Sequence, residues 1–210
     1  MRVTEIFFSI QGEGTRAGLP CIFVRFTGCD LRCVYCDTAY AFHGGREMSQ
    51  DAILAEVARH PCRLVLLTGG EPLLQRELPE LARRLLALGY EVTVETHGQR
   101  PLDGLPEGLV RIVDVKTPDS GEVATDLGVL DRLTARDEVK FVVSSEADFA
   151  WSRDVVRRHA LEGRVQVLFS PVWGKVEPRE LADWILASGL GARLSLQIHK
   201  VIWGAAARGV

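Results

Sequence analysis

The feature that most limits the possible folds is an alternation of apolar runs with helical patterns, from about residue 20 to the end of the chain. Helical spacing of apolar residues appears at 49–60, 77–88, 147–159 and 178–188. Strands that are apolar throughout and are followed by helices form parallel sheets covered by those helices, so the pattern predicts an α/β fold. The predicted strands are Cys21–Thr27, Arg63–Thr68, Glu91–Glu95, Arg111–Lys116, Val139–Val143, Val165–Phe169 and Leu194–Ile198.

Two segments interrupt this alternation. Residues 95–111 are rich in glycine and proline, and residues 116–126 have the character of a loop, so neither is expected to hold a full helix. We therefore expect an incomplete parallel (βα) barrel of about six strands, with some helices reduced, in a single domain spanning 1–210. In such folds the functional site lies at the carboxyl ends of the strands.

The composition excludes several classes of protein. Of the 210 residues, 47% are apolar and 25% are charged, as in a globular domain, and no apolar run approaches the length of a membrane helix. With 25 basic and 28 acidic residues the net charge is −3, which gives no basic face for a nucleic-acid partner. Unpaired cysteines and the absence of a secretory leader predict a cytoplasmic location.

Three of the five cysteines, Cys29, Cys33 and Cys36, form a C-x3-C-x2-C run. Three thiolates can bind three irons of a [4Fe–4S] cube and leave the fourth iron open to a small ligand. A zinc site is the alternative, because thiolates also bind zinc, although His43 is the one further candidate ligand close by in the sequence. An odd number of cysteines does not favour a disulfide framework.

A second motif, T-G-G-E-P at Thr68–Pro72, follows a predicted buried strand. Its glycines allow a ligand to approach the backbone closely, and Glu71 can accept a hydrogen bond from an ammonium group. Together with the cysteine run, in which Tyr35 precedes the last cysteine, this motif resembles those of the radical S-adenosylmethionine (SAM) enzymes. The resemblance implies a modified radical-SAM core, with a [4Fe–4S] cluster and SAM as cofactors.

Further segments resemble one family in particular, the 7-carboxy-7-deazaguanine synthases. They include E-I-F-F-S-I-Q-G-E-G at 5–14, G-C-D-L-R-C-V-Y-C-D-T at 28–38 and Q-I-H-K-V-I-W at 197–203. The resemblance implies conversion of 6-carboxy-5,6,7,8-tetrahydropterin to 7-carboxy-7-deazaguanine with loss of ammonia, a carbon–nitrogen lyase step toward queuosine-type bases. In that reaction SAM is regenerated rather than consumed.

The resemblance also implies roles for individual residues. The cluster ligands are Cys29, Cys33 and Cys36, and Thr38 is a ligand of Mg²⁺. Residues 1–20 are a substrate-binding extension. SAM contacts are implied for Tyr35, Cys36, Asp37, Gly70, Glu71, Asp114, Val115 and Lys116. Substrate contacts are implied for Ile10, Gln11, Gly12, Glu13, Arg25, Thr68 and Val210.

Three of these roles have alternatives in the sequence. Arg25 lies in an apolar strand, where it can bind a substrate carboxylate or form a structural ion pair with Glu5 or Glu13. Thr38 offers one neutral oxygen, so Mg²⁺ requires further ligands from substrate and water; a cap of a helix or turn is the other interpretation. Asp114-Val115-Lys116 stands where many members of the family have S-P-K, and Gly209-Val210 stands where many end in proline.

The implied partners are the pterin substrate, an external one-electron reductant of the flavodoxin or ferredoxin type, and a second copy of the chain in a homodimer. Two other functions use similar cysteine motifs. A glycyl-radical activase is one, but it has no evident use for Q-G-E-G and Arg25. A non-catalytic iron–sulfur or zinc module is the other, and it has no evident use for the G-G-E motif.

Overall fold

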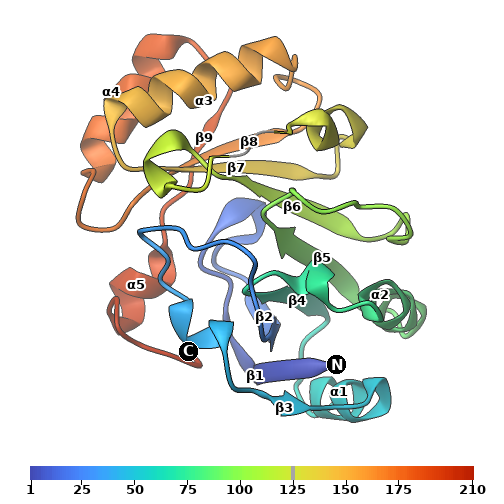
Figure 1. Ribbon diagram of the computed structural model, residues 1–210. Helices are drawn as coiled ribbons and strands as arrows, with labels where there is room; N and C mark the ends of the chain where they lie inside the picture. The colour runs from blue at the N-terminus through green and yellow to red at the C-terminus, as the bar shows by residue number, and fades with distance from the viewer. Residues whose placement is uncertain (124–125) are drawn as a thin grey trace.

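The computed structural model describes residues 1–123 and 126–210. Its centre is one sheet in the order β3-β1-β2-β4-β5-β6-β7-β8-β9 (Figure 1). The strands are β1 (Arg2–Ile10), β2 (Pro20–Phe26), β3 (Arg46–Glu47), β4 (Leu64–Gly69), β5 (Glu91–Thr96), β6 (Val110–Val115), β7 (Glu138–Val143), β8 (Gln166–Pro171) and β9 (Arg193–Leu194). The α-helices are α1 (Gln50–Val57), α2 (Leu78–Ala87), α3 (Glu146–Arg158), α4 (Pro178–Ser188) and α5 (Ile198–Trp203).

From β2 onward all neighbouring strands are parallel, whereas β1 pairs antiparallel with both β2 and β3. The sheet is not closed, because β3 and β9 form its two edges. The prediction of an incomplete parallel barrel is therefore confirmed, and β2 and β4 to β8 are its six long parallel strands. The segment before residue 20 contributes β1 to the same sheet.

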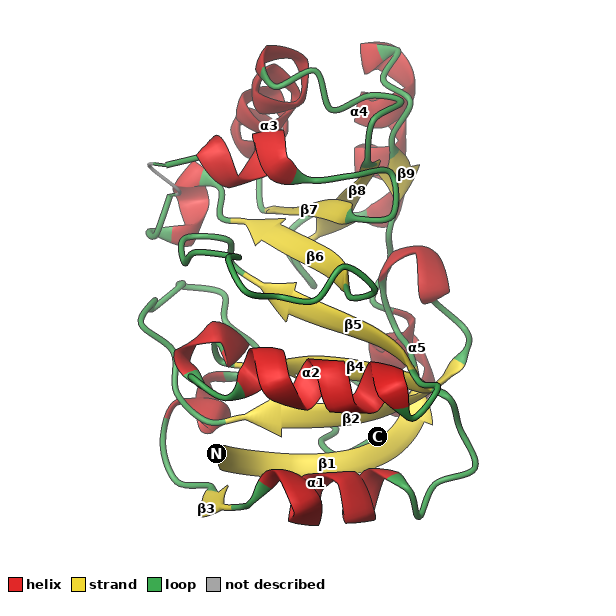
Figure 2. Ribbon diagram, turned by 90° about the vertical axis from the view of Figure 1, so that its right-hand side faces the viewer, coloured by secondary structure: helices red, strands yellow, loops and turns green. Residues whose placement is uncertain are grey.

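The two faces of the sheet have different partners because side chains alternate along each strand. On one face, Ile22, Val24 and Phe26 of β2 pack with α1 and α2, and a second apolar cluster joins β6 to β8 with α3 and α4. Figure 2 shows α1 and α2 on this side of the strands and α5 on the other. The opposite face carries Phe23 and Arg25 and lines a cavity.

Local sequence explains where the helices begin and end. The Ser49 hydroxyl accepts a hydrogen bond from the backbone N–H of Ala52 at the start of α1, and Ser145 caps α3 in the same way. Pro178 occupies the first turn of α4, where its missing N–H costs nothing, and Gly189 closes that helix with φ of 70°. Within the part that the structure describes, no helix is both long and apolar enough to cross a bilayer.

The prediction for the end of the chain was wrong in part. A strand was predicted over Leu194–Ile198, but strand pairing stops at Leu194 and α5 begins at Ile198. The apolar residues there read as a strand because a six-residue helix is too short to show helical periodicity. The short edge strand β3 also had no clear signal. Of the predicted loop 116–126, residues 124–125 lie outside the described residues.

Candidate functional site

A cavity of about 710 Å³ opens on the inner face of the sheet, at the carboxyl ends of the parallel strands. Alternation along the strands decides which side chains reach it. Arg25 and Thr68 are direct partners in the β2–β4 register and both face the cavity. Asp114 and Lys116 also line it, whereas Val115 points into the apolar core and is 1% exposed. The sequence-predicted site residues thus meet in one place, with two exceptions, Val115 and Glu71.

The loop of residues 28–36, which we call the cysteine loop, follows β2. It brings Cys29, Cys33 and Cys36 to the cavity wall. The Cys36 N–H donates to the Cys33 carbonyl at 3.1 Å, and Leu31 N–H donates to Cys29 Sγ at 3.4 Å. Burial raises the pKa of the Cys33 thiol to about 11, and it also raises the pKa of Cys29 and of Cys36. The thiols are therefore protonated at neutral pH, and binding of a metal would release their protons.

The placement of the three thiols is compatible with a cluster. Among residues 1–123 and 126–210, no three histidine, cysteine or acidic side chains are placed to share one ion. In a [4Fe–4S] cube each thiolate binds a separate iron, so the sulfurs need not converge. All three cysteines border the same cavity, beside the loop of residues 69–74, which we call the glycine loop. The cavity leaves room there for a cluster and a small ligand.

The glycine loop packs tightly against the cysteine loop. A Cβ on Gly70 would lie 2.1 Å from the Gly28 carbonyl oxygen, and one on Gly69 would lie 2.3 Å from that of Phe26. Glu71 N–H donates to the Gly28 carbonyl at 2.7 Å. Backbone atoms of Gly69 and Gly70 border the cavity, as a motif that holds a ligand through its backbone requires.

The Glu71 side chain is fully buried and does not line the cavity. Its carboxylate accepts hydrogen bonds from the Leu73 N–H at 2.9 Å, the Thr96 hydroxyl at 2.8 Å and the His97 N–H at 3.0 Å. The sequence suggested that this carboxylate could accept a hydrogen bond from an ammonium group. In the structure it already accepts hydrogen bonds from these three donors. In this arrangement Glu71 shapes the loop, and the backbone of Gly70 is what faces the cavity.

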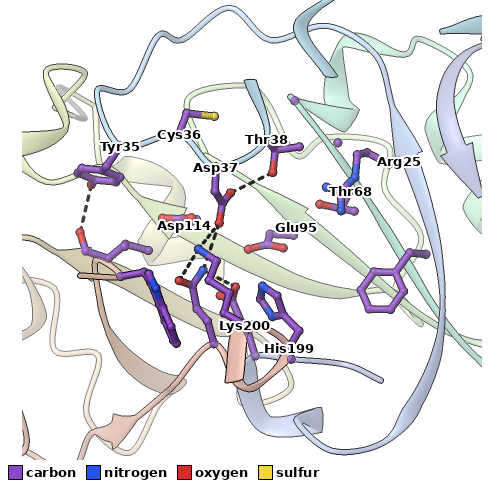
Figure 3. Close-up of a pocket in the computed structure, with 18 of the residues that line it drawn as sticks. Arg25, Tyr35, Cys36, Asp37, Thr38, Thr68, Glu95, Asp114, His199 and Lys200 are labelled. Carbon is purple, nitrogen blue, oxygen red and sulfur yellow. Dashed lines mark hydrogen bonds and ion pairs between the residues drawn. The ribbon is translucent and has the colours of Figure 1, made fainter. Parts of the chain in front are cut away.

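Arg25 forms one of the structural ion pairs that the sequence offered, and its side chain also lines the cavity. Its Nε donates to Glu5 Oε1 at 2.8 Å, and Tyr40 donates its hydroxyl proton to the same oxygen at 2.8 Å. The guanidinium also lines the cavity (Figure 3), with no hydrogen bond from its two terminal nitrogens to any described residue. Glu5 therefore orients Arg25 and leaves its fork available.

The N-terminal segment meets α5 at the cavity. Ile198 N–H donates to the Gly12 carbonyl at 3.0 Å, and a Cβ on Gly12 would lie 2.0 Å from His199 Nδ1. Gln197 Nε2 donates to Glu13 Oε1 at 2.9 Å. Only glycine fits at position 12. Gly12 lies among Ile10, Gln11 and Glu13, which also line the cavity.

A buried charge network that was not predicted from the sequence forms part of the cavity wall. Lys140 Nζ lies 2.9 Å from Glu13 Oε2 and 3.3 Å from Asp114 Oδ2, and it also pairs with Glu95. Lys116 pairs with Asp114 Oδ2 at 2.9 Å, while Asp114 Oδ1 is buried and has no hydrogen-bond partner among the residues that the structure describes. The available signal was a charged residue at inward positions of apolar strands, E-V-T-V-E-T and E-V-K-F-V-V, where a charge is costly unless paired.

The residues that flank the last cysteine are also fixed. Tyr35 donates its hydroxyl proton to the Val142 carbonyl at 3.1 Å, and its ring borders the cavity. Asp37 accepts hydrogen bonds from Lys200 Nζ at 2.6 Å and from the Thr38 hydroxyl at 3.0 Å (Figure 3). Burial raises the pKa of Asp37, but the Lys200 ammonium outweighs burial and holds the pKa below its ordinary value.

The last residues of the chain complete the wall. The Arg208 guanidinium lies 4.3 Å from the Tyr40 ring centroid, and Gly209 and Val210 border the cavity. Val210 thus lies at the cavity, and the substrate contact that the resemblance implies for it stays a prediction.

Comparison with known proteins agrees with this geometry. Residues 23–119 match the Radical SAM superfamily. The 7-carboxy-7-deazaguanine synthase of Koribacter versatilis is 49% identical over 100% of both chains, and that of Chlorobaculum tepidum is 41% identical over 100% of this chain and 97% of the other.

Solved structures share the fold. The crystal structure of QueE from Escherichia coli superposes with a TM-score of 0.77 at 24% identity and covers 93% of each chain. Streptococcus suis SuiB bound to S-adenosylmethionine superposes with a TM-score of 0.55 at 12% identity, over 81% of this chain and 48% of that one. From the full-length identities above, the chain belongs to the 7-carboxy-7-deazaguanine synthase family.

Proposed function

We propose that the chain is a carbon–nitrogen lyase that converts 6-carboxy-5,6,7,8-tetrahydropterin to 7-carboxy-7-deazaguanine with loss of ammonia. The observation that carries the proposal is the meeting of three elements in one cavity: the cysteine loop, the glycine loop and the Gln11–Glu13 segment. An activase that acts on a protein needs no enclosed substrate segment of this kind. A non-catalytic module needs neither the glycine loop nor a guanidinium fork.

The cysteines Cys29, Cys33 and Cys36 would hold the cluster, and Tyr35 and the Gly70 backbone would contact SAM beside it. When bound, these cofactors supply a carbon-centred radical that removes a hydrogen atom from the substrate. The chain itself binds and orients. Cys36, Asp37, Asp114 and Lys116 line the same cavity and would contribute to the cofactor pocket. Glu71 and Val115, which do not line it, would act through the backbone or the packing around it.

At the other end of the cavity, Arg25 would receive the substrate carboxylate, because a guanidinium fork matches a carboxylate with two bonds. Thr68, its register partner, and Gln11 to Glu13 would contact the pterin ring. The ring edge carries N–H donors, and Glu13 presents a carboxylate whose pKa is lowered: burial raises it, but the nearby Lys140 ammonium outweighs burial. Ile10 and Val210 would close this end.

Thr38 would ligate Mg²⁺ through its hydroxyl. Mg²⁺ takes about six oxygens, so substrate oxygens and water must provide the rest, and we expect the ion to bind with the substrate. Asp37, directly beside Thr38, is already paired with Lys200 and offers no free charge to the ion.

The proposal extends to the partners of the enzyme. A one-electron reductant of the flavodoxin or ferredoxin type would supply the cluster with an electron, and two copies of the chain would form a homodimer. The expected location is the cytoplasm, where thiols stay reduced.

The decisive experiment is anaerobic reconstitution with iron and sulfide, followed by incubation with SAM, a reductant and the carboxypterin. Mass spectrometry should find 7-carboxy-7-deazaguanine, one ammonia per product and undiminished SAM. Steady consumption of SAM without a deazapurine would contradict the proposal and favour a different radical enzyme. Absence of any SAM cleavage or cluster would favour the non-catalytic module.

A further inference from the structure

His97 occupies an unusual position for a residue with no assigned role. It follows β5, its side chain is 3% exposed, and its Nε2 lies 3.0 Å from Asp30 Oδ1 and 3.2 Å from Glu71 Oε2. The first of these carboxylates belongs to the cysteine loop and the second to the glycine loop. One imidazole nitrogen therefore touches both loops that build the cofactor end of the cavity.

The hydrogen bonds fix which nitrogen of the ring carries the proton. Gln99 N–H donates to His97 Nδ1 at 3.0 Å, so Nδ1 is an unprotonated acceptor. The proton then lies on Nε2, where both neighbours are carboxylate oxygens that can only accept. The Nε2–H group donates to Asp30 Oδ1 at 3.0 Å, and the backbone N–H of the same residue donates to Glu71 Oε2 at 3.0 Å. His97 therefore holds both carboxylates, one through its ring and one through its backbone.

Each carboxylate is firmly attached to its own loop. Asp30 follows Cys29 directly, and its other oxygen accepts a hydrogen bond from Arg100 Nε at 3.0 Å. Glu71 follows Gly70 and accepts three hydrogen bonds, from the Leu73 N–H of its own loop, from the Thr96 hydroxyl and from the backbone N–H of His97. Displacement of either carboxylate would therefore move Cys29 relative to Gly70.

Loss of the ring donor would release the cysteine loop from His97. Among the described residues, Asp30 would then be held by Arg100 alone, whereas Glu71 would keep its backbone donors. Asp30 is 36% exposed, so water and Arg100 weaken its repulsion from Glu71, and the loss of the tie between the two loops is the main effect.

We infer that His97 is a positioning residue that sets the spacing between Cys29 and the Gly70 backbone, because its ring Nε2–H binds Asp30 and its backbone N–H binds Glu71. The inference rests on the proposed function in one respect, that Cys29 holds the cluster and Gly70 faces SAM. His97 itself acts through the two carboxylates and needs no contact with either cofactor. Its chemical requirement is a donor at the position of Nε2.

Two substitutions separate this role from simple packing. His97→Gln places an amide N–H near the position of Nε2 and loses the acceptor for Gln99. His97→Asn places its amide near the position of Nδ1, keeps an acceptor for Gln99 and cannot reach the carboxylates. His159→Asn is the matched control, because His159 Nδ1 pairs with Asp131 at 3.0 Å at the end of α3, outside the cavity.

The first measurement uses the protein without cofactors. Hydrogen–deuterium exchange should be faster in His97→Asn than in wild type for peptides that cover 28–36 and 69–74. It should be close to wild type in His97→Gln and in His159→Asn. Because this measurement needs neither a cluster nor a pterin, it remains decisive even if no deazaguanine product forms.

The second measurement uses the reconstituted protein without pterin. We expect His97→Asn to bind SAM about tenfold more weakly or worse, the effect of one lost charged hydrogen bond. The SAM-induced change in the electron paramagnetic resonance spectrum of the reduced cluster should shrink with it, and His97→Gln should restore both. Equal behaviour of the two variants would overturn the inference. A general rise in exchange over the whole sheet, with SAM affinity unchanged, would also overturn it.

Discussion

The Lys200 ammonium lies 2.6 Å from Oδ2 of Asp37, so the last helix of the chain is tied to the residue that follows the third cysteine of the motif. Lys200 also donates to Gln197 Oε1 at 2.8 Å, and Gln197 in turn donates to Glu13. Through these contacts α5 holds together the cysteine loop and the N-terminal segment.

Replacement of Lys200 should change how the free energy of unfolding depends on pH, because it removes the ion pair with Asp37. Asp37 has a depressed pKa in the folded protein, so the pair stabilises the fold above the ordinary value of 3.8 and this contribution is lost as the pH falls below it. Because Asp37 is 47% exposed, we expect Lys200→Gln to cost only about 1 kcal/mol near neutral pH. Denaturant unfolding at several pH values measures the difference.

The matched control is Arg84→Gln, which breaks a surface pair with Asp51 on the helix-covered face. Its cost should be smaller, at most a few tenths of a kcal/mol. A difference between wild type and Lys200→Gln that stays constant as the pH falls below 3.8 would show that the ion pair does not contribute as described.

The cysteines fall into two groups. Cys29→Ala, Cys33→Ala and Cys36→Ala should each abolish cluster absorbance and activity, because the loop supplies every protein ligand. Cys21→Ala and Cys62→Ala should retain both, since Cys21 is buried on β2 and neither residue lines the cavity. Iron and sulfide analysis after anaerobic reconstitution checks this. Stoichiometric zinc with no uptake of iron would count decisively against it.

Arg25→Lys should raise KM for the carboxypterin roughly ten- to hundredfold, the worth of a charge-assisted pair. The lysine keeps the charge but loses the planar fork. SAM binding and the cluster should be unchanged, and a pterin without the carboxylate should not distinguish the two enzymes.

Glu5→Gln is the companion variant, because it removes the charge that orients Arg25 and keeps an acceptor at the same place. It should raise KM less than Arg25→Lys does. If Arg25 serves only its ion pair with Glu5, both variants will lower the melting temperature and leave KM alone.

Thr38→Ala should weaken the acceleration by Mg²⁺ more than it weakens SAM cleavage, since the hydroxyl would contribute one oxygen to an ion that the substrate completes. Thr38→Ser keeps that oxygen and should respond to Mg²⁺ like wild type. Turnover in chelator-treated enzyme, with and without added Mg²⁺, measures the effect. Equal rates in the two conditions would refute a magnesium site.

The sequence predicted the parallel strands well because each is a continuous apolar run with a polar residue at its carboxyl end. It also predicted that these polar ends meet, since parallel strands deliver them to one edge of the sheet. It did not reveal that Glu71 turns away from the cavity. That outcome depends on the Thr96 hydroxyl and the His97 N–H, which a neighbouring strand brings within reach.

The Lys140 charge network could not be predicted from the sequence either, because it also depends on contacts between distant segments. Its members Glu13, Glu95 and Asp114 come from three separate segments, and only the register of the sheet brings them to one ammonium. Alternation indicates which face a charged residue occupies, but the identity of its partner is a long-range property. The helix α5 was not predicted for a local reason. Its one and a half turns are too short to show helical periodicity.

The contact between α5 and the cysteine loop has a consequence for the order of events during synthesis. The cysteine loop leaves the ribosome early, whereas Lys200 and Gln197 come from the far end of the sequence. At roughly 5–20 residues per second, on the order of ten seconds or more pass before α5 can dock. During that interval the Lys200–Asp37 and Gln197–Glu13 contacts are missing. The cysteine loop and the N-terminal segment are therefore joined to α5 only at the end of synthesis.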